Sequence, residues 1–280
     1  MDEVKILSCG AGMQSTALAL MSCENAKKNN KYPLVPIYNA IIFCDLGKEP
    51  PWVYGQVDFI QKTCEAASIP FYILDTHLYQ DYVKNFGKSR VVTVPFWSID
   101  ENGKKGKMTR HCTIDYKIVA IQKFVRWTLL GYKKGQRTKK EDIGAHEMHI
   151  GFSTEEQQRI FNSKHVLFVN KFPLVEMGLE RKDNYAYILD IWGLETKASA
   201  CQFCPFHKNY FFKYLKENYE TEYKDMVEFD DMLEKGQPNT AIRSKLFISR
   251  SRKRIKDLLP EECNDKECFR YKQKDIWNGF

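Results

Sequence analysis

A C-x-x-C pair near residue 200 is the clearest chemical feature of this chain. Cys201 and Cys204 enclose two residues and are followed by a proline. In a reducing compartment such a pair is a ligand pair for a metal or cluster, or a redox dithiol. Proline after a ligand cysteine is common beside iron–sulfur clusters. Cys112 is the third candidate ligand, with His111 or His207 as a fourth. Three interpretations stay open: a [4Fe–4S] cluster, a tetrahedral Zn²⁺ site, and buried cysteines without metal.

A glycine-containing loop, SCGAGMQST over residues 8–16, is the second such feature. Its glycines permit positive φ and close backbone approach, so consecutive N–H groups can face an anion. The next hydroxyls fall at a predicted helix N-terminus, where the dipole favours negative charge. A Walker A lysine and the third glycine of a dinucleotide fingerprint are both missing. The loop predicts a phosphate site, with an unliganded turn as the alternative. The expected contacts are Ser8, Gly10, Ala11, Gly12, Gln14, Ser15 and Thr16.

Clustered cations are the third feature, within a net charge of +7. The stretch from Thr240 to Lys256 has seven cations and no acid. Shorter basic runs lie at Lys104–Arg110 and Lys133–Lys140. Clustered Lys and Arg favour a polyanion through counterion release. The alternatives are a solvated surface, or pairing of the last run with acids at 228–231. The nucleic-acid contacts expected in that run are Arg243, Lys245, Arg250, Arg252, Lys253 and Arg254.

The elements that must position these residues alternate between strands and helices in the first third of the chain. The apolar run Ala40–Cys44 is typical of a strand buried on both faces. This βαβαβ order predicts a parallel sheet with right-handed crossovers. The predicted strands are 4–8, 40–44, 71–74, 147–152 and 165–169, and the predicted helices are 14–28, 52–67, 114–130, 184–192, 210–218 and 220–233.

The expected fold class is therefore α/β with a doubly wound, mostly parallel sheet, followed by a helical and basic C-terminal extension. We place the nucleotide-binding domain at residues 1–200 and the region that begins with the C-x-x-C pair at 201–280. Hydrophobic residues make up 43% of the chain, which is enough for a core. No run of about 18 apolar residues and no signal peptide are apparent, so we expect a cytoplasmic protein without a membrane partner.

The loop at 8–16 resembles the S-G-G-x-D-S motif of the PP-loop (HUP-like) superfamily, with Gln14 where many members have Asp. Its Gln-Ser-Thr form is similar to the PAPS-reductase-like branch. Three further segments resemble that branch in the same order: FCDLGKE at 43–49, RHCTIDYK at 110–117 and IGFSTEEQQR at 150–159. The resemblance spans roughly residues 4–210 and adds Asp45, Gly151 and Arg159 as nucleotide contacts. Phe152 and Ser153 stand where an Arg is common.

This resemblance implies ATP, or PAPS or APS, as ligand, together with Mg²⁺. In adenylylsulfate reductases a Cys-Cys pair and a later C-x-x-C hold a [4Fe–4S] cluster, and here His111 replaces the first cysteine. Three remaining thiolates resemble the arrangement in tRNA 2-thiolation enzymes. The reductase tail Glu-Cys-Gly-x-His is incomplete, because Glu262 and Cys263 are followed by Asn264 and Asp265. The segments at 228–231 and 247–251 resemble PAPS-reductase-like proteins of phages and prophages.

The leading functional hypothesis is ATP-dependent transfer of sulfur to a nucleic-acid base through an adenylated intermediate. A sulfonucleotide reductase and a non-catalytic nucleotide-sensing module are the alternatives. We assign no catalytic residue. The expected partners are an adenine nucleotide, an RNA or DNA substrate, a sulfur donor of unassigned chemistry and, for oligomeric state, a second copy in a homodimer.

Overall fold

The computed structural model describes residues 3–27, 30–88, 94–236 and 242–263. The chain divides into two compact units, each built from separated segments. The first unit comprises Met1–Asp45, Pro51–Thr76 and Lys117–Ser199, and the second comprises Leu46–Pro50, His77–Tyr116 and Ala200–Phe280. One boundary between these units falls between residues 199 and 200, beside the predicted division after residue 200. Residues 46–50 and 77–116 cluster with the C-terminal segment, because the chain leaves the first unit and returns to it, which no single division of the sequence can represent.

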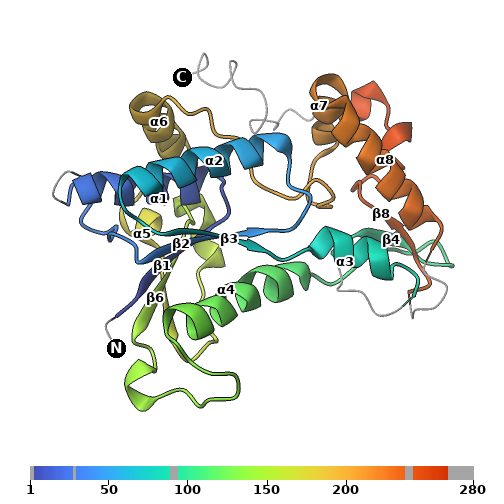
Figure 1. The fold of residues 1–280 in the computed structure, drawn as a ribbon. Coiled ribbons are helices and arrows are strands. Elements are labelled where there is room, and N and C mark those ends of the chain that lie inside the picture. Colours follow the sequence, from blue (N-terminus) through green and yellow to red (C-terminus); the bar gives the residue numbers. More distant parts are fainter. Residues whose placement is uncertain (1–2, 28–29, 89–93, 237–241, 264–280) are drawn as a thin grey trace. The chain divides into compact units, whose positions relative to one another are not determined.

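A five-stranded parallel sheet forms the centre of the first unit, in the order β3-β2-β1-β6-β7. Its strands are β1 (Lys5–Cys9), β2 (Ala40–Asp45), β3 (Phe71–Asp75), β6 (His146–Ile150) and β7 (Phe168–Lys171). Helices lie on both faces of this sheet: α1, α2 and α6 on one face and α4 on the other (Figure 1). The prediction of an α/β unit with a parallel sheet is confirmed.

Alternation along the central strand supplies both hydrophobic layers of this unit. Ile6 and Leu7 of β1 are both fully buried although successive side chains point to opposite faces. Ile6 packs in one cluster with Ile121 and Val125, which come from the helical segment on the α4 face. The helices of this unit are α1 (Met13–Lys27), α2 (Pro51–Ala66), α4 (Val119–Phe124), α5 (Pro173–Glu176) and α6 (Arg181–Trp192), with short 3₁₀ segments at Lys140–Asp142 and Thr154–Arg159.

The segment predicted as one helix from Ile114 to Leu130 combines α-helical and π-helical turns. Only α4 is α-helical, and π-helical turns at Ile114–Ile118 and Val125–Leu129 flank it. Apolar periodicity predicted the helical segment and its length, but it does not distinguish i→i+4 from i→i+5 hydrogen bonding. The junction between the two units falls inside the first π-helical turn.

The second unit combines a small antiparallel sheet with three helices. Its strands are β4 (Trp97–Ile99), β5 (Lys105–Lys107) and β8 (Lys245–Phe247), in the order β5-β4-β8. Its helices are α3 (Leu78–Asn85), α7 (Asn209–Asn218) and α8 (Glu220–Glu234), with short 3₁₀ turns at Ile255–Asp257 and Pro260–Cys263. The sequence did not predict α3, β4, β5 or β8. Strands of three residues are too short to display an alternating pattern. The C-terminal region is consequently not a purely helical extension.

Aromatic rings fill the interior of the second unit. Phe229 of α8 packs against Tyr79, Tyr82, Phe96 and Phe203, with ring centroids 5.4 to 6.0 Å apart. These tilted contacts suit the aromatic quadrupole better than face-to-face stacking. Because Phe203 lies between the two cysteines of the C-x-x-C pair, this core also anchors the cysteine turn.

Among the described residues, no helix is long and apolar enough to cross a membrane.

Three polar side chains are hydrogen-bonded in a row at β6 of the first unit. The hydroxyl of Tyr38 lies 3.3 Å from Nδ1 of His149, and Nε2 of His149 lies 2.9 Å from a carboxylate oxygen of Glu147. His149 is 3% exposed. Burial lowers the pKa of His149 below its ordinary value of 6.5, and the neighbouring Glu147 carboxylate only partly opposes that shift. The folded state therefore favours the neutral ring.

Acidification is expected to destabilise the first unit through this histidine. As the pH falls through 6.5, the unfolded chain takes up the proton before the folded chain does. The contribution is complete above that pH and is lost below it. Thermal unfolding followed by calorimetry between about pH 8 and about pH 5 should show a falling midpoint. The slope should be shallower in His149→Gln but unchanged in His111→Gln, which alters an exposed histidine. Equal slopes in all three proteins would contradict this assignment.

Candidate functional site

The carboxyl ends of β1 and β6 meet at a topological switch point in the first unit. From β1 the chain continues to β2 and β3 on one side, whereas β6 and β7 lie on the other. In open α/β sheets, ligands bind in the crevice at such a reversal. Ser8 of β1 is in register with Ile150 of β6, so the loops after both strands emerge side by side. Those are the predicted phosphate loop and the predicted Gly151 segment.

The loop after β1 leaves several backbone donors unused. Ala11 adopts a left-handed conformation with φ of 50°. The hydroxyl of Ser15 accepts from the Gly10 N–H at 3.2 Å and donates to the Gly12 carbonyl at 3.3 Å. The first helical bond runs from the Thr16 N–H to the Gly12 carbonyl at 2.9 Å. Within the described residues, no acceptor takes the N–H groups of Gly12, Met13 and Gln14. These donors lie at the positive end of a 15-residue helix, where an anion is favoured.

Gly151 allows the loop after β6 to approach the start of α1. A Cβ atom at this position would lie only 2.8 Å from the backbone nitrogen of Ser15. Beyond it, Ser153 and Glu156 receive the side-chain amide of Gln14 at 3.4 Å and 2.8 Å. The Gln14 side chain is thus an amide held by a carboxylate. This contact fixes one loop against the other.

A second clamp on the phosphate loop was not foreseen from the sequence. Gln56 of α2 is 2% exposed and donates to the carbonyls of Ala11 and, at 3.2 Å, Lys197. Its own carbonyl accepts from the Lys197 N–H at 2.6 Å. The segment 197–199 therefore runs beside the loop. Ser199 lies so close that its Oγ would be 2.6 Å from a Cβ added at Gly12.

Lys197 is a cation in the segment that runs beside the loop. Its ammonium lies 5.7 Å from the centroid of the Trp52 ring, and Trp52 donates to the Ala198 carbonyl at 3.0 Å. Both the tryptophan and the backbone of this segment are thus held in place. An isolated lysine before a C-x-x-C pair carries no sequence signal for phosphate binding, because only the fold brings it to residue 11.

The other residues predicted to contact the nucleotide are engaged by neighbouring side chains, buried, or part of a strand. Asp45 ends β2 and accepts from the Tyr54 hydroxyl at 3.2 Å. Arg159 pairs with Glu156 and lies 4.3 Å from the centroid of the Phe152 ring. Thr16 is fully buried, so its hydroxyl is not presented to solvent. Ser8 lies within β1 between two paired strands. Thr16 is thus held in the interior, and Ser8 belongs to the strand rather than to the loop.

The C-x-x-C pair forms a tight turn in the second unit. The Cys204 N–H donates to the Cys201 carbonyl at 2.9 Å. Gln202, between them, is 2% exposed; its N–H donates to the Lys48 carbonyl at 2.9 Å and its side-chain amide to the Glu49 carbonyl at 3.1 Å. The segment after β2, predicted to lie near the nucleotide, is thereby bound to the cysteine turn.

Cys112 and Cys204 are electrostatic neighbours despite their separation in sequence. Burial raises the pKa of the Cys112 thiol, the Arg110 guanidinium lowers it, and the Cys204 thiol raises it again. The Nε2 of His207 lies 2.9 Å from the Cys201 carbonyl oxygen, and its ring stacks on that of Phe211 with the centroids 3.5 Å apart. Across the described part of the chain, no three His, Cys, Asp or Glu side chains are gathered as metal ligands. The Cys204 thiol therefore acts on the pKa of Cys112, while the cluster and the zinc site stay predictions.

Much of the basic C-terminal run is engaged within the second unit. Arg254 is 6% exposed and pairs at 2.9 Å with Asp230, while Lys256 pairs with Asp231 at 2.7 Å. Lys253 pairs with Glu262 at 2.8 Å. These are largely the internal contacts named as the alternative to phosphate binding. Arg254 in particular is occupied in the interior, so the structure gives it a different role from the predicted one.

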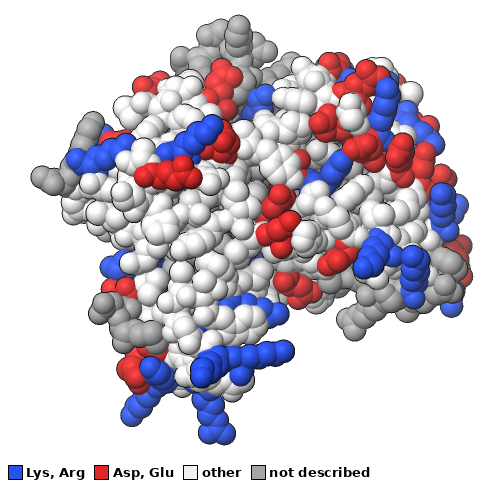
Figure 2. All heavy atoms as spheres, viewed as in Figure 1, with Lys and Arg blue, Asp and Glu red and all other residues white. Residues whose placement is uncertain are grey.

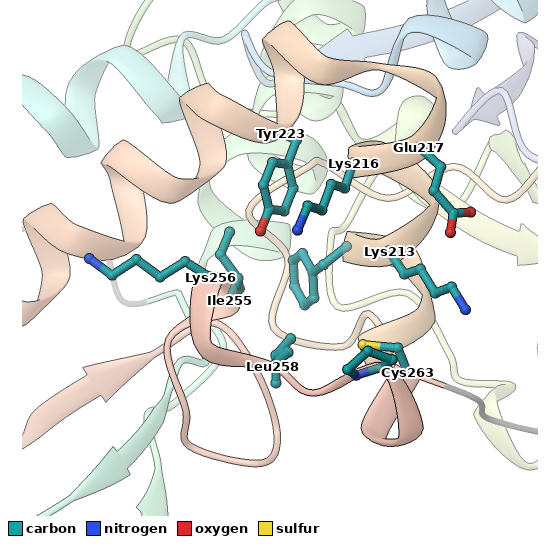
Figure 3. Close-up of a pocket in the computed structure, with 10 residues that line it drawn as sticks. Lys213, Lys216, Glu217, Tyr223, Ile255, Lys256, Leu258 and Cys263 are labelled. Carbon is teal, nitrogen blue, oxygen red and sulfur yellow. The ribbon is translucent and has the colours of Figure 1, made fainter.

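Two other features carry charge. The run Lys133–Lys140 is exposed, and Figure 2 shows cations gathered over this segment between α4 and β6. A cavity of about 380 Å³ lies beside α7 and the two last 3₁₀ turns. In Figure 3 the Lys216 side chain points toward Tyr223, whereas Lys213 and Lys256 point away. No residue predicted to bind nucleotide or metal lines this cavity.

Neither a protein-family model nor a curated protein matches this chain.

Gly151→Ala should weaken nucleotide binding. The added methyl group would press on the backbone at Ser15, which cannot yield as a flexible side chain can. Overpacking of this kind costs about 1–3 kcal/mol. We expect ATP affinity, measured by calorimetry, to fall by about tenfold, which is roughly 1.4 kcal/mol. Gly55→Ala is the matched control, because nothing lies within 4 Å of the added atom. Unchanged affinity in Gly151→Ala would remove this loop from the site.

Proposed function

We propose that this protein uses ATP to replace a carbonyl oxygen of a nucleic-acid base by sulfur, in the manner of PP-loop enzymes. The observation that carries the proposal is the set of unused N–H groups on Gly12, Met13 and Gln14 at the switch point of a parallel sheet. Such donors at a helix N-terminus favour phosphate groups. ATP suits this reaction because its AMP moiety can be transferred to the carbonyl oxygen of the base. That oxygen then departs with AMP as the leaving group.

The activation step follows from phosphoryl chemistry. The base carbonyl oxygen attacks the α-phosphorus of ATP, and pyrophosphate departs with the electron pair of the broken P–O bond. Developing charge on the phosphates calls for cations, which Mg²⁺ and Lys197 would supply. The role of the loop is to hold and orient the nucleotide, and positioning accounts for most of the catalysis in this class of reaction.

In the sulfur step Cys112 and Cys204 would hold the sulfur donor. Hydrosulfide from that donor attacks the carbon that bears the adenylated oxygen. AMP leaves with that oxygen and the electron pair of the broken C–O bond, and loss of the S–H proton leaves the thiocarbonyl. A [4Fe–4S] cluster or Zn²⁺ would take Cys112, Cys201 and Cys204. The described side chains do not gather three donors at one point, so they do not form such a site by themselves.

Sulfonucleotide reduction is the second candidate, and the position of Cys263 disfavours it. A reductase needs an accessible tail cysteine to attack the sulfonyl group. Cys263 is 5% exposed and lies in a 3₁₀ turn. A nucleotide-sensing module needs only the switch-point loop and is favoured by the Gln14–Glu156 contact, which ties down the residue that replaces the usual Asp.

Two variants should divide the reaction into its halves. Gly12→Val places side-chain atoms against Ser199 and should abolish pyrophosphate release from ATP in the presence of bulk RNA or DNA. Cys204→Ser should still release pyrophosphate but yield no thionated nucleoside by mass spectrometry of the digested nucleic acid. Cys263→Ser is the matched control and should leave both readouts unchanged.

The same assays separate the three candidates. Sulfite release from PAPS that is lost in Cys263→Ser would establish the reductase instead. ATP binding without pyrophosphate or sulfite would establish the sensing module. A UV-visible spectrum of anaerobically purified protein distinguishes an iron–sulfur cluster from zinc, since only the former absorbs there.

A further inference from the structure

An exposed aromatic ring lies between two cations beside the thiols of the second unit. Phe206, two residues after Cys204, is 45% exposed. The Lys107 ammonium lies 5.0 Å from the centroid of its ring, and the Arg110 guanidinium lies 5.4 Å from it. Arg110 precedes Cys112 by two residues. A large apolar ring held at the surface between cations is a candidate for recognition of a ligand that is both flat and anionic.

Trp97 of β4 joins this ring to the C-terminal basic run. Its indole N–H donates to the Pro205 carbonyl at 2.9 Å, which fixes the backbone before Phe206. Lys107, Arg250 and Arg252 lie 5.5, 5.8 and 5.2 Å from its ring centroid. Four separate stretches of sequence thus meet at two aromatic rings.

The cations of this surface are oriented but not neutralised. Arg252 is held by the backbone carbonyls of Ser98 at 3.2 Å and Gly106 at 3.1 Å, which link it across the β4–β5 pair. Among the described residues, Lys107, Arg110 and Arg250 form no ion pair. This contrasts with Lys253, Arg254 and Lys256 of the same run, which all pair with carboxylates. The charges that remain available are those around the aromatic rings.

We propose that these two aromatic rings and the cations around them form a platform that binds single-stranded nucleic acid. The platform consists of Phe206, Trp97, Lys107, Arg110, Arg250 and Arg252. A base stacks on Phe206, and the neighbouring phosphates contact Lys107, Arg110 and Arg250. Base–aromatic stacking combined with a cationic path for the backbone is the usual chemistry of single-strand binding. The inference rests on the proposed function only in taking nucleic acid as the partner.

Single strands fit this surface better than duplexes do. A paired and stacked base hides its faces, so an exposed phenyl ring can stack only on a base that is unpaired or extruded. The platform also adjoins Cys112 and Cys204 in sequence on both sides.

Fluorescence anisotropy with labelled oligonucleotides of mixed sequence tests the platform on the full chain. We expect single-stranded RNA or DNA to bind more tightly than a blunt duplex of the same length. Phe206→Leu should weaken single-strand binding by about tenfold, within the roughly 1–3 kcal/mol that stacking contributes per base. Phe206→Trp should restore it. Phe161→Leu is the matched control, because Phe161 is 44% exposed in the first unit.

The contribution of the cations to oligonucleotide binding is tested by the dependence of affinity on salt concentration. Lys107→Gln with Arg110→Gln should reduce the log–log salt slope by about 1.4, since each phosphate contact on a single strand contributes about 0.7. Lys133→Gln with Lys134→Gln removes the same charge from an exposed basic run and should change the slope less. Thermal melting of each variant reports whether it is folded.

Three results would overturn the platform: equal affinity for duplex and single strand, full affinity in Phe206→Leu, or equal loss in the two lysine-containing double variants. Displacement of the oligonucleotide by an acidic peptide at matched charge would assign the surface to a protein partner instead. ATP binding and pyrophosphate release in Phe206→Leu are independent readouts. If they persist while single-strand binding is lost, the platform and the ATP chemistry are both upheld; if they are absent in the wild-type protein, only the proposed function fails.

Discussion

The parallel pairing of β1 with β6 is the constraint on which the candidate nucleotide site depends. It joins strands that are separated by more than half of the first unit's sequence and places both following loops at one edge. Only glycine at position 151 allows that edge to close against the first turn of α1. The unused N–H groups of the loop then lie at the edge where the loops after β1 and β6 emerge together, the position at which open α/β sheets bind their ligands.

Buried side-chain amides perform the same task in each unit. Gln56 holds the phosphate loop to the segment at Lys197, and Gln202 holds the cysteine turn to the segment after β2. Both amides are 2% exposed. Removing one partner of a buried hydrogen bond leaves a desolvated polar group, at a cost of about 1–3 kcal/mol. These amides therefore fix irregular segments that lack the ladder of a helix or a sheet.

The cations of the second unit fall into two groups: some form ion pairs with carboxylates, and others lie over aromatic rings. Arg254 and Asp230 are buried together, where the ion pair and the hydrogen bond to the Ile255 N–H offset the desolvation of both groups. Around Trp97 and Phe206, by contrast, guanidinium and ammonium groups face aromatic rings instead of carboxylates. A count of cations along the run could not separate these two groups, because pairing depends on side chains that come from α8 and β4.

The sequence by itself determined the parallel α/β core, the loop after β1, the C-x-x-C turn and the approximate ends of most helices. Those features depend on local periodicity and on residues within about ten positions of one another. Only the tertiary structure decided that residues 77–116 join the C-terminal region, that β8 pairs with β4, and that Gln56 and Lys197 lie at the phosphate loop. It also decided that the Cys204 thiol acts on the pKa of Cys112 and that His207 contacts the Cys201 carbonyl and stacks on Phe211. Such contacts arise from chain crossings between distant segments, and they leave no periodic trace because each requires only one suitable side chain at one place.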